Sequence, residues 1–317
     1  MYQKRLLELE DQGYGLHAGD KITIQDLLYG LMLKSGNDCA IALAEYVGNS
    51  VDNFAQMMNL KAKELGLKRT NFVTVNGLDD DEHYTTALEL AKITDYALKN
   101  NKFKDIVGCK NYTVTINGYG KNIQNTNELL GSLNGVYGVK TGFTNGANRC
   151  LVTSIKRGNM DIICVILGAD TKKDRTRDSI KVIEYIYSNY EIVNVEGYVE
   201  KFFEEWNERN KISVIKGKQE YLELEIGEYN VKEIPVCKEE IKDIEIKVDN
   251  LSVLNAPIEE GKKVGEIKFK VNGKTRISID IRSSKEIRKK NIDDYFEDMI
   301  TNISYYFEDF LFKRVYL

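Results

Sequence analysis

Apolar residues recur every three or four positions through most of the first 190 residues, which is the spacing of helices with one buried face. Thr23 is suited to cap the first helix, because its hydroxyl can accept a hydrogen bond from a free backbone N–H. Helices are predicted over residues 24–34, from Asn37 or Asp38 onward, over residues 51–65, from a cap at Thr85 or Thr86 to residue 99, and over residues 174–190. The tripeptide Ser35-Gly36-Asn37 therefore lies in a tight connection between two helices.

Four short runs in the same region have the composition or alternation of β-strands. They cover residues 111–116, 136–140, 150–156 and 160–167, and turn residues follow the first of them at 117–120. Closely spaced strands that follow a helical block and precede a closing helix indicate an antiparallel sheet flanked by helices. Residues 1–195 are thus predicted to form one α+β domain.

The composition changes near Gly197, where short strand-like runs replace the helical pattern. Several runs alternate apolar and polar residues, as strands with one wet face do. They cover residues 211–215, 221–226, 244–248, 266–271 and 276–281. Residues 198–283 are therefore predicted to form a small all-β domain, and this part of the sequence shows no catalytic grouping.

The last segment, residues 285–317, has the pattern of an amphipathic helix. One side would carry Ile292, Tyr295, Phe296, Met299, Ile300, Ile303, Tyr306, Phe307, Phe310 and Leu311. The other side would carry Asp293, Asp294, Glu297, Asp298, Glu308 and Asp309. Such a helix either packs on its own protein or lies in a membrane interface, where its acidic side would weaken attachment to anionic lipid. It is too interrupted by charge to span a bilayer.

Composition narrows the classes of function. A chain of 317 residues with 42% hydrophobic and 30% charged residues is typical of a soluble globular protein of two domains. Its net charge of −4 argues against nucleic acid as a partner. Five scattered cysteines without a CxxC pair predict free thiols, and no metal or cofactor is expected. With two histidines in the chain, serine chemistry would need a lysine as its base.

Two short motifs carry candidate chemistry: Ser35-Gly36-Asn37 and Lys140-Thr141-Gly142. Each alone is a weak signal. Gly36 can end one helix while Asn37 caps the next, and strands often end at a turn with glycine. Their order and their surroundings, taken together, are far more specific.

With its flanking residues the chain resembles the serine-type D-alanyl-D-alanine carboxypeptidases, which are low-molecular-weight penicillin-binding proteins. The matching segments are residues 19–23, 26–33, 35–38, 40–45, 76–81, 83–86, 125–127 and 138–144. The resemblance covers essentially all of residues 12–190, and a β-rich segment followed by an amphipathic helix matches the family's C-terminal half. It implies a penicillin-recognising, transpeptidase-like fold for the first domain.

The resemblance also implies a role for each motif residue. Ser35 would pass a proton to the leaving D-alanine nitrogen as a general acid. Asn37 would hydrogen-bond the substrate amide. Lys140 and Thr141 would hold the terminal carboxylate of a peptidoglycan stem peptide ending in D-Ala-D-Ala, and Gly142 would let the backbone approach closely. β-Lactams are the expected inhibitors, and the extracytoplasmic face of the cell membrane is the expected location.

One member of the family's motif set is missing. The family forms its acyl-enzyme on a serine followed one helical turn later by a lysine, roughly sixty residues before Ser-Gly-Asn. Only 34 residues precede Ser35, and none forms Ser-x-x-Lys. The one match, at residues 213–216, lies in a predicted strand, where the serine and the lysine would point to opposite faces. We therefore expect a chain that lacks an N-terminal segment and is inactive alone.

Other features keep further interpretations open. A non-catalytic peptidoglycan-binding protein would keep Ser35 and Lys140 to grip a muropeptide, whereas a class A β-lactamase is disfavoured by the predicted β domain. Asn76 stands where the family often has a histidine, which bears on the fine positioning of a substrate. Residues 1–10 are charged like the side of a helix and show no secretory signal.

Overall fold

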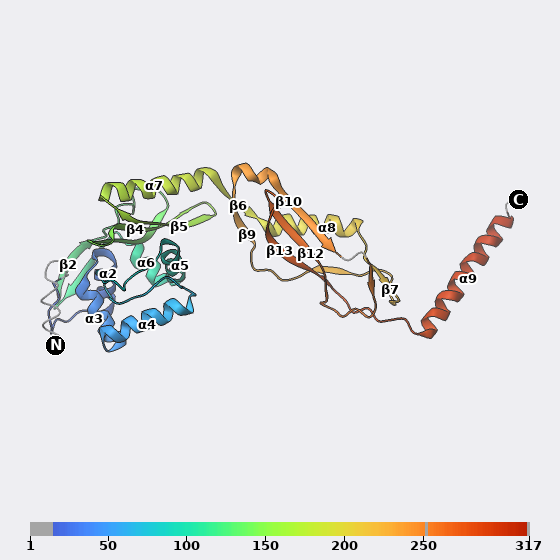
Figure 1. Cartoon of the computed structure of the whole chain (residues 1–317), viewed down its shortest axis with the longest axis horizontal. Helices are drawn as coiled ribbons and strands as arrows, with labels where there is room; N and C mark the ends of the chain where they lie inside the picture. The colour runs from blue at the N-terminus through green and yellow to red at the C-terminus, as the bar shows by residue number, and fades with distance from the viewer. Residues whose placement is uncertain (1–14, 251–252, 316–317) are drawn as a thin grey trace. The chain divides into compact units, whose positions relative to one another are not determined.

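The computed structural model describes residues 15–250 and 253–315 (Figure 1). The chain divides into two compact units between Ser188 and Asn189. The change in sequence pattern predicts the boundary between the domains slightly later, at residues 195–198. The helical pattern noted at residues 1–10 lies outside the described residues.

Helices make up much of the first unit, where the periodicity predicts them. They are α2 Ile24–Lys34, α3 Asn37–Gly48, α4 Val51–Glu64, α5 Ala87–Leu98, α6 Asn101–Gly108 and α7 Lys172–Asn189. Thr23, Ser50 and Thr86 each accept a hydrogen bond from the backbone N–H three residues on, as N-cap residues do. The short α6 was not predicted, because it follows α5 almost without a break and its cap is Asn100.

Three strands of the first unit form an antiparallel sheet in the order β3-β4-β5. They are β3 Val136–Thr144, β4 Asn148–Arg157 and β5 Met160–Ala169. Strands β1 Asn111–Ile116 and β2 Tyr119–Gln124 form a separate hairpin, whose turn residues Asn117 and Gly118 both have positive φ. In the described part of the chain, β3 pairs on one side only and is an edge of its sheet.

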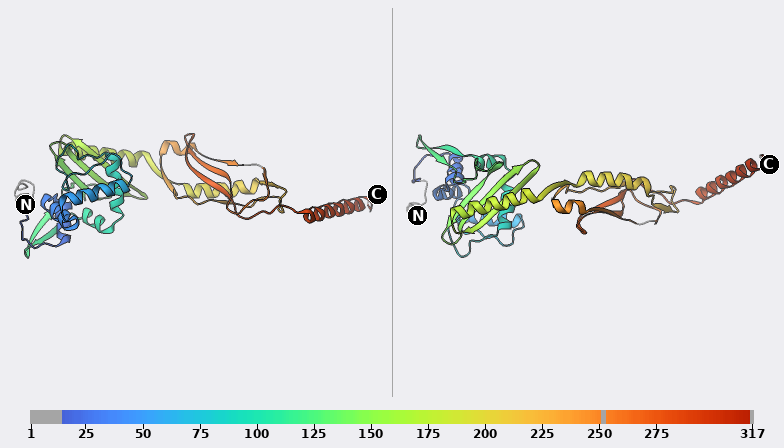
Figure 2. Two further views of the ribbon diagram at one scale, coloured as in Figure 1. Left: turned by 60° about the horizontal axis from the view of Figure 1, so that its bottom comes forward. Right: turned by 90° about the horizontal axis from the view of Figure 1, so that it is seen from above.

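Helices cover both faces of the sheet β3-β4-β5 (Figure 1). On one face, α5 and α6 pack through a cluster centred on Val107, Val139 and Val152. On the other face, Ile183 of α7 packs with Ile155, and Figure 2 shows α7, in yellow-green, lying across the strands. The predicted α+β arrangement, an antiparallel sheet flanked by helices, is confirmed.

The connection between α2 and α3 is held by its own apolar cluster. Leu33 and Cys39, on either side of this connection, are fully buried and pack with Val114 of β1. The buried Asp38 carboxylate also accepts hydrogen bonds from the backbone N–H groups of Gly15, Leu16 and Cys39. Packing and hydrogen bonds therefore fix the short stretch between the two helices, where Ser35 lies.

The second unit is rich in β-structure, but the prediction of an all-β domain over residues 198–283 is wrong, because most of α8 (Val195–Arg209) and a short 3-10 helix lie in that range. It contains β6 Tyr190–Asn194, α8 Val195–Arg209, β7 Ser213–Ile215, β8 Leu224–Ile226, β9 Glu233–Cys237, η1 Lys238–Asp243, β10 Ile244–Asn250, β11 Val253–Asn255, β12 Lys263–Val271 and β13 Lys274–Ser283. A four-stranded sheet in the order β10-β12-β13-β8 shares one core with α8, in which Val199 and Phe203 meet Phe269. Helix α8 was not predicted, because it begins where the composition changes.

The last helix, α9 Ile292–Val315, begins later than the predicted 285. Ile287 belongs instead to the core of the second unit, where it is 1% exposed and forms a β-bridge with Ile258. Among residues 292–305 of α9, whose side chains the structure describes, seven large apolar or aromatic side chains are exposed, and the first six belong to the predicted apolar side: Ile292, Tyr295, Phe296, Met299, Ile300, Ile303 and Tyr305. The predicted side-chain positions at 306–311 lie outside the described side chains. Asp294 pairs with Lys218, and no helix among residues 15–250 and 253–315 has the length and apolar character needed to cross a membrane.

Candidate active site

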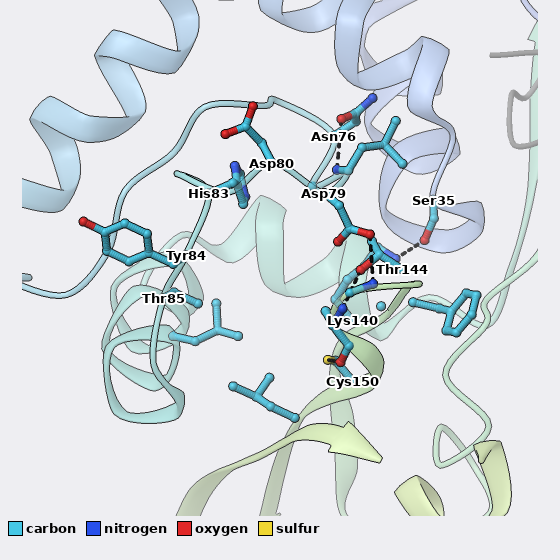
Figure 3. Close-up of a pocket in the computed structure, with 18 of the residues that line it drawn as sticks. Ser35, Asn76, Asp79, Asp80, His83, Tyr84, Thr85, Lys140, Thr144 and Cys150 are labelled. Atoms are coloured by element: carbon cyan, nitrogen blue, oxygen red, sulfur yellow. Dashed lines mark hydrogen bonds between the residues drawn. The ribbon is translucent and has the colours of Figure 1, made fainter. Parts of the chain in front are cut away.

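Both sequence motifs line one pocket of about 890 Å3 in the first unit (Figure 3). Ser35 comes from the connection between α2 and α3, and Lys140 comes from β3. A loop over residues 76–85 contributes another part of the wall. The other predicted site residues that line this pocket are Asn37, Thr141 and Gly142. The fold thus brings together all five residues that the sequence singled out.

Ser35 ends α2 in the left-handed backbone region, with φ 61° and ψ 39°. A residue with a side chain costs about 1–2 kcal/mol in this region, so the surrounding structure must hold it there. The Ser35 N–H donates to the carbonyl oxygen of Leu31 at 3.0 Å, and the Gly36 N–H donates to that of Gly30 at 3.2 Å. These two bonds close the last turn of α2 and fix the reversal of the chain that places Ser35 in the pocket.

The Lys140 ammonium donates hydrogen bonds to the Ser35 hydroxyl and, at 2.8 Å, to the carbonyl oxygen of Thr141 (Figure 3). Burial disfavours its charged form, and the positive charge of Arg175 acts in the same direction. Together they lower the pKa of Lys140 to about 8. The amine is therefore still mostly protonated at neutral pH, the state that the predicted binding of a carboxylate would require.

Thr141 and Gly142 follow Lys140 along β3. The Thr141 hydroxyl lies 2.7 Å from that of Thr126, whose backbone N–H donates to the carbonyl oxygen of Leu33 at the end of α2. A Cβ added at Gly142 would lie 3.6 Å from the Cβ of Cys150, an ordinary contact. The packing of the protein itself therefore does not require glycine at this position, which leaves the approach of a ligand backbone as the predicted reason for it.

Asn37 is the first residue of α3 and is 6% exposed. It lines the pocket, although the sequence analysis had weighed it as a plain helix cap. The structure gives the cap position to Gly36, which makes no side-chain capping bond. The Asn37 amide is therefore not needed to start α3.

Two family models match the chain. The model for D-alanyl-D-alanine carboxypeptidase covers residues 9–171, and the model for the C-terminal domain of penicillin-binding protein 5 covers residues 200–289. This chain belongs to the D-alanyl-D-alanine carboxypeptidase family. The second match agrees with the β-rich second unit.

Relatives in this carboxypeptidase family extend over both units. The D-alanyl-D-alanine carboxypeptidase DacF of Bacillus subtilis is 32% identical over 275 residues, which are 86% of this chain and 69% of the relative. DacA of Escherichia coli is 33% identical over 268 residues, which are 82% of this chain and 62% of the relative. The chain therefore spans roughly two thirds of the length of these curated relatives.

A solved structure gives the same fold. Penicillin-binding protein 5 from Haemophilus influenzae superposes with a TM-score of 0.65 at 27% sequence identity, covering 83% of this chain and 74% of that one. The resemblance inferred from the two motifs is thus confirmed at the level of family and fold.

In this family member, the loop over residues 76–85 is tied to the turn between β3 and β4, a contact that the sequence analysis missed. Asp79 accepts hydrogen bonds from the Thr144 side chain and, at 2.9 Å, from the Gly146 backbone N–H (Figure 3). The bond from Thr144 is the larger cause of a lowered pKa at Asp79. His83 ties the loop to the segment before it, because its Nδ1 accepts the backbone N–H of Val73 at 3.0 Å. Burial lowers the pKa of His83, which favours this accepting, neutral form.

Arg175 of α7 is a second group that the sequence analysis missed. Its side chain is 2% exposed and donates to both carboxylate oxygens of Glu128 at 2.7 Å. Its charge acts on Lys140, as noted above. The signal was present in the sequence: Arg175 lies on the buried stripe of α7 with Ser179 and Ile183, at helical steps of four. A charged residue on the buried side of a helix is rarely unpaired, so Arg175 at this position predicts a buried ion pair.

Glu89 of α5 supports one wall of the pocket. Its carboxylate accepts the backbone N–H groups of Lys68 and Arg69 and the hydroxyl of Thr70, which in turn lies 2.8 Å from the hydroxyl of Thr85. The bond from Thr70 is the largest cause of a pKa below the ordinary 4.5. The ionised form therefore stabilises the folded state.

We expect a pH-dependent loss of stability in Glu89→Gln. Because the folded-state pKa of Glu89 is depressed, its contribution is complete above pH 4.5 and disappears as the pH falls through the lower folded-state value. Urea unfolding between pH 3 and 7 should show wild type and variant far apart at pH 7 and converging under acid conditions. Glu64→Gln, which changes an exposed carboxylate of α4, is the matched control. A constant difference across this range would contradict the assignment.

No arrangement in the described part of the chain suggests a metal. Among residues 15–250 and 253–315, no group of three or more His, Cys, Asp and Glu side chains is placed to hold a metal ion. The five cysteines are free, with Cys39 and Cys164 buried. The side chains that line the pocket supply hydroxyl, amine, amide and carboxylate groups, together with the His83 imidazole and the Cys150 thiol.

Proposed function

We propose that this chain carries the proton-transfer and carboxylate-binding side of a serine-type D-Ala-D-Ala carboxypeptidase site. The reaction would remove the terminal D-alanine of peptidoglycan pentapeptides through an acyl-enzyme. The observation that carries this proposal is the hydrogen bond between Lys140 and Ser35 inside a pocket large enough for a peptide. Family membership supplies the class of reaction.

The substrate would lie along the free edge of β3. An extended peptide can add to such an edge through backbone hydrogen bonds, and Lys140 and Thr141 would then meet its terminal carboxylate. A carboxylate beside the Lys140 ammonium favours the charged amine, so substrate binding would reverse part of the pKa depression. Gly142, with no side chain, would leave room for the peptide backbone.

Ser35 and Asn37 would act on the scissile bond. Ser35, hydrogen-bonded to the Lys140 ammonium, can hand a proton to the leaving nitrogen and regain one from Lys140. Asn37 would hydrogen-bond the substrate amide. No acylated serine is assigned in the first unit, where no serine is followed three residues later by a lysine, and the match at residues 213–216 lies partly on the strand β7.

The missing nucleophile favours a second candidate, a non-catalytic peptidoglycan-binding protein. Such a protein would use Lys140 and Thr141 to hold the stem peptide and would need no acyl-enzyme. Both candidates act at the extracytoplasmic face of the cell membrane, to which α9 would attach through its exposed apolar side. The two candidates would bind the carboxylate at the same site, but only the carboxypeptidase would cleave the peptide.

The carboxylate site can be tested by equilibrium binding. We expect N-acetyl-L-Lys-D-Ala-D-Ala to bind the 317-residue chain in isothermal titration calorimetry. Lys140→Ala should weaken binding about 10- to 100-fold, because a hydrogen bond to a charged group contributes about 1.5–3 kcal/mol. Lys156→Ala, at an exposed position of β4, is the matched control.

A second ligand separates charge recognition from general peptide binding. The same peptide with a C-terminal carboxamide should bind wild type as weakly as the free acid binds Lys140→Ala. Equal affinity of wild type for the acid and the amide would exclude a carboxylate site at Lys140.

A further inference from the structure

In the proposed function, the Ser35 hydroxyl donates a proton and the Lys140 ammonium binds an anion. The same two groups are also a nucleophile and a base in direct hydrogen-bonding contact at a pocket wall (Figure 3). A serine beside a lysine is one of the arrangements by which proteins activate a hydroxyl.

Lys140 is oriented so that it can act as a base toward Ser35. One N–H of the amine donates to the carbonyl oxygen of Thr141 at 2.8 Å, a hydrogen bond that a neutral amine can also donate. The lone pair of the neutral amine is then free to accept the Ser35 O–H. Burial and the charge of Arg175 lower the pKa of Lys140 to about 8, so the neutral form is well populated in mildly alkaline solution.

The backbone presents Ser35 in a way that suits attack on an electrophile. Its left-handed conformation places it on a sharp turn between two helices, and such constrained turns recur at functional side chains. The turn leads directly into the N-terminus of α3, where Gly36 provides no side-chain cap. The first N–H groups of a helix carry partial positive charge, which favours negative charge that develops nearby.

We propose that the Ser35–Lys140 pair of this chain is a nucleophilic dyad that forms a covalent adduct on Ser35 with electrophiles carrying a good leaving group. The Ser35 proton moves to the neutral Lys140 amine as Oγ bonds to the carbonyl carbon of an aryl ester or the phosphorus of a fluorophosphonate. The leaving group departs with the electron pair of the broken bond, as a phenolate or as fluoride. Lys140 ends as the ammonium ion.

The dyad is proposed for such activated electrophiles. An amide nitrogen leaves only when it gains a proton, so cleavage of an amide by this dyad would need a further transfer of the proton from the Lys140 ammonium to that nitrogen. Phenolate and fluoride leave without a proton. The inference is therefore compatible with a chain that releases no D-alanine, and it goes beyond the proposed function.

The test uses a biotinylated fluorophosphonate on the 317-residue chain. We expect one adduct per chain by intact mass, located on Ser35 by tandem mass spectrometry. The labelling rate should fall at least 100-fold in Ser35→Ala and in Lys140→Arg, which keeps the charge and cannot act as a base near neutral pH. Lys34→Ala and Ser278→Ala, at exposed positions on α2 and β13, should label at the wild-type rate.

The pH dependence identifies the base. The rate should rise with pH through about 8 as Lys140 loses its proton. Other ionisable groups also line the pocket or act on Lys140: Arg175 from α7, Cys150 from β4, and Asp79, Asp80, Asp81, His83 and Tyr84 from the loop. The rise of the labelling rate with pH should also be seen in Cys150→Ala, which removes the thiol. The residual labelling rate of Lys140→Arg should not rise through about pH 8.

Three outcomes would overturn the dyad. They are the absence of an adduct on wild type, an adduct that persists in Ser35→Ala, and a rate that is unchanged in Lys140→Arg. Thermal melts monitored by circular dichroism show that each variant is folded, and Lys140→Arg decides the matter should Ser35→Ala melt early. Failure of the peptide to bind in calorimetry would affect the proposed function alone, so the two proposals can fail separately.

Discussion

The 317-residue chain is expected to release no D-alanine from a pentapeptide, whereas a chimera that adds a Ser-x-x-Lys segment is expected to release it. The pocket holds the groups that are proposed to bind a carboxylate and relay a proton, yet no serine of the first unit is followed three residues later by a lysine. The segment would be taken from the Bacillus subtilis relative and joined at residue 15. A coupled assay for free D-alanine measures the difference.

Variants of the chimera assign the roles. Lys140→Ala should lower kcat/KM by about 100- to 1000-fold, the effect of removing one preorganised donor from a catalytic site. Ser35→Ala should lower kcat with little change in KM, because its proton is transferred in the chemical step. Lys34→Ala, an exposed lysine next to Ser35, is the control.

Two results would contradict this account. One is D-alanine release by the 317-residue chain that disappears in Lys140→Ala, which would mean that the chain has its own nucleophile for amides. The other is a chimera whose activity survives Lys140→Ala, which would remove Lys140 from substrate binding. Retained peptide binding by a chain without turnover would favour the non-catalytic candidate.

The helices around the site could be predicted because their signals are local. Thr23 caps α2, and the periodic segment 24–34 corresponds to the helix as observed. Strand β3 was predicted to end at Lys140, yet it continues to Thr144, because Phe143 and Thr144 pair with Arg149 and Asn148 across the turn. That pairing depends on the partner strand, and the residue types of β3 alone do not reveal it.

The site itself was predictable as far as its motifs reach. Ser35 and Lys140 are 105 positions apart, and their family pattern was enough to bring them together. The bond between Asp79 and Gly146 joins positions 67 apart, and that between Arg175 and Glu128 joins positions 47 apart. No local pattern links these partners, so the contacts that shape the loop and the charge near Lys140 emerge from the fold.

The exposed apolar side of α9 is the feature of the second unit that we expect to contribute most to attachment of the protein to a membrane. Six exposed side chains of this apolar side are described, from Ile292 to Ile303, and burial of each in a lipid interface would contribute about 1.5–3 kcal/mol when complete. Asp294 and Asp298 pair with Lys218 and Lys290, which offsets part of the acidic charge. Burial of the apolar side chains should therefore contribute more to membrane attachment than charge does. Repulsion between the acidic side chains and anionic headgroups should be weaker, and salt should screen it.

Deletion of residues 292–317 should abolish flotation with vesicles that contain anionic lipid. The deletion begins after Ile287, whose bridge to Ile258 belongs to the core, so the second unit should keep its thermal melt. High salt should leave binding of the full chain intact or strengthen it, because salt screens the repulsion. Phe296→Ser with Ile300→Ser should weaken binding at least 10-fold, while Glu297→Gln on the polar side serves as the control. Loss of binding in high salt, or equal flotation of the deleted form, would show that the apolar side of α9 serves a protein contact and not a membrane.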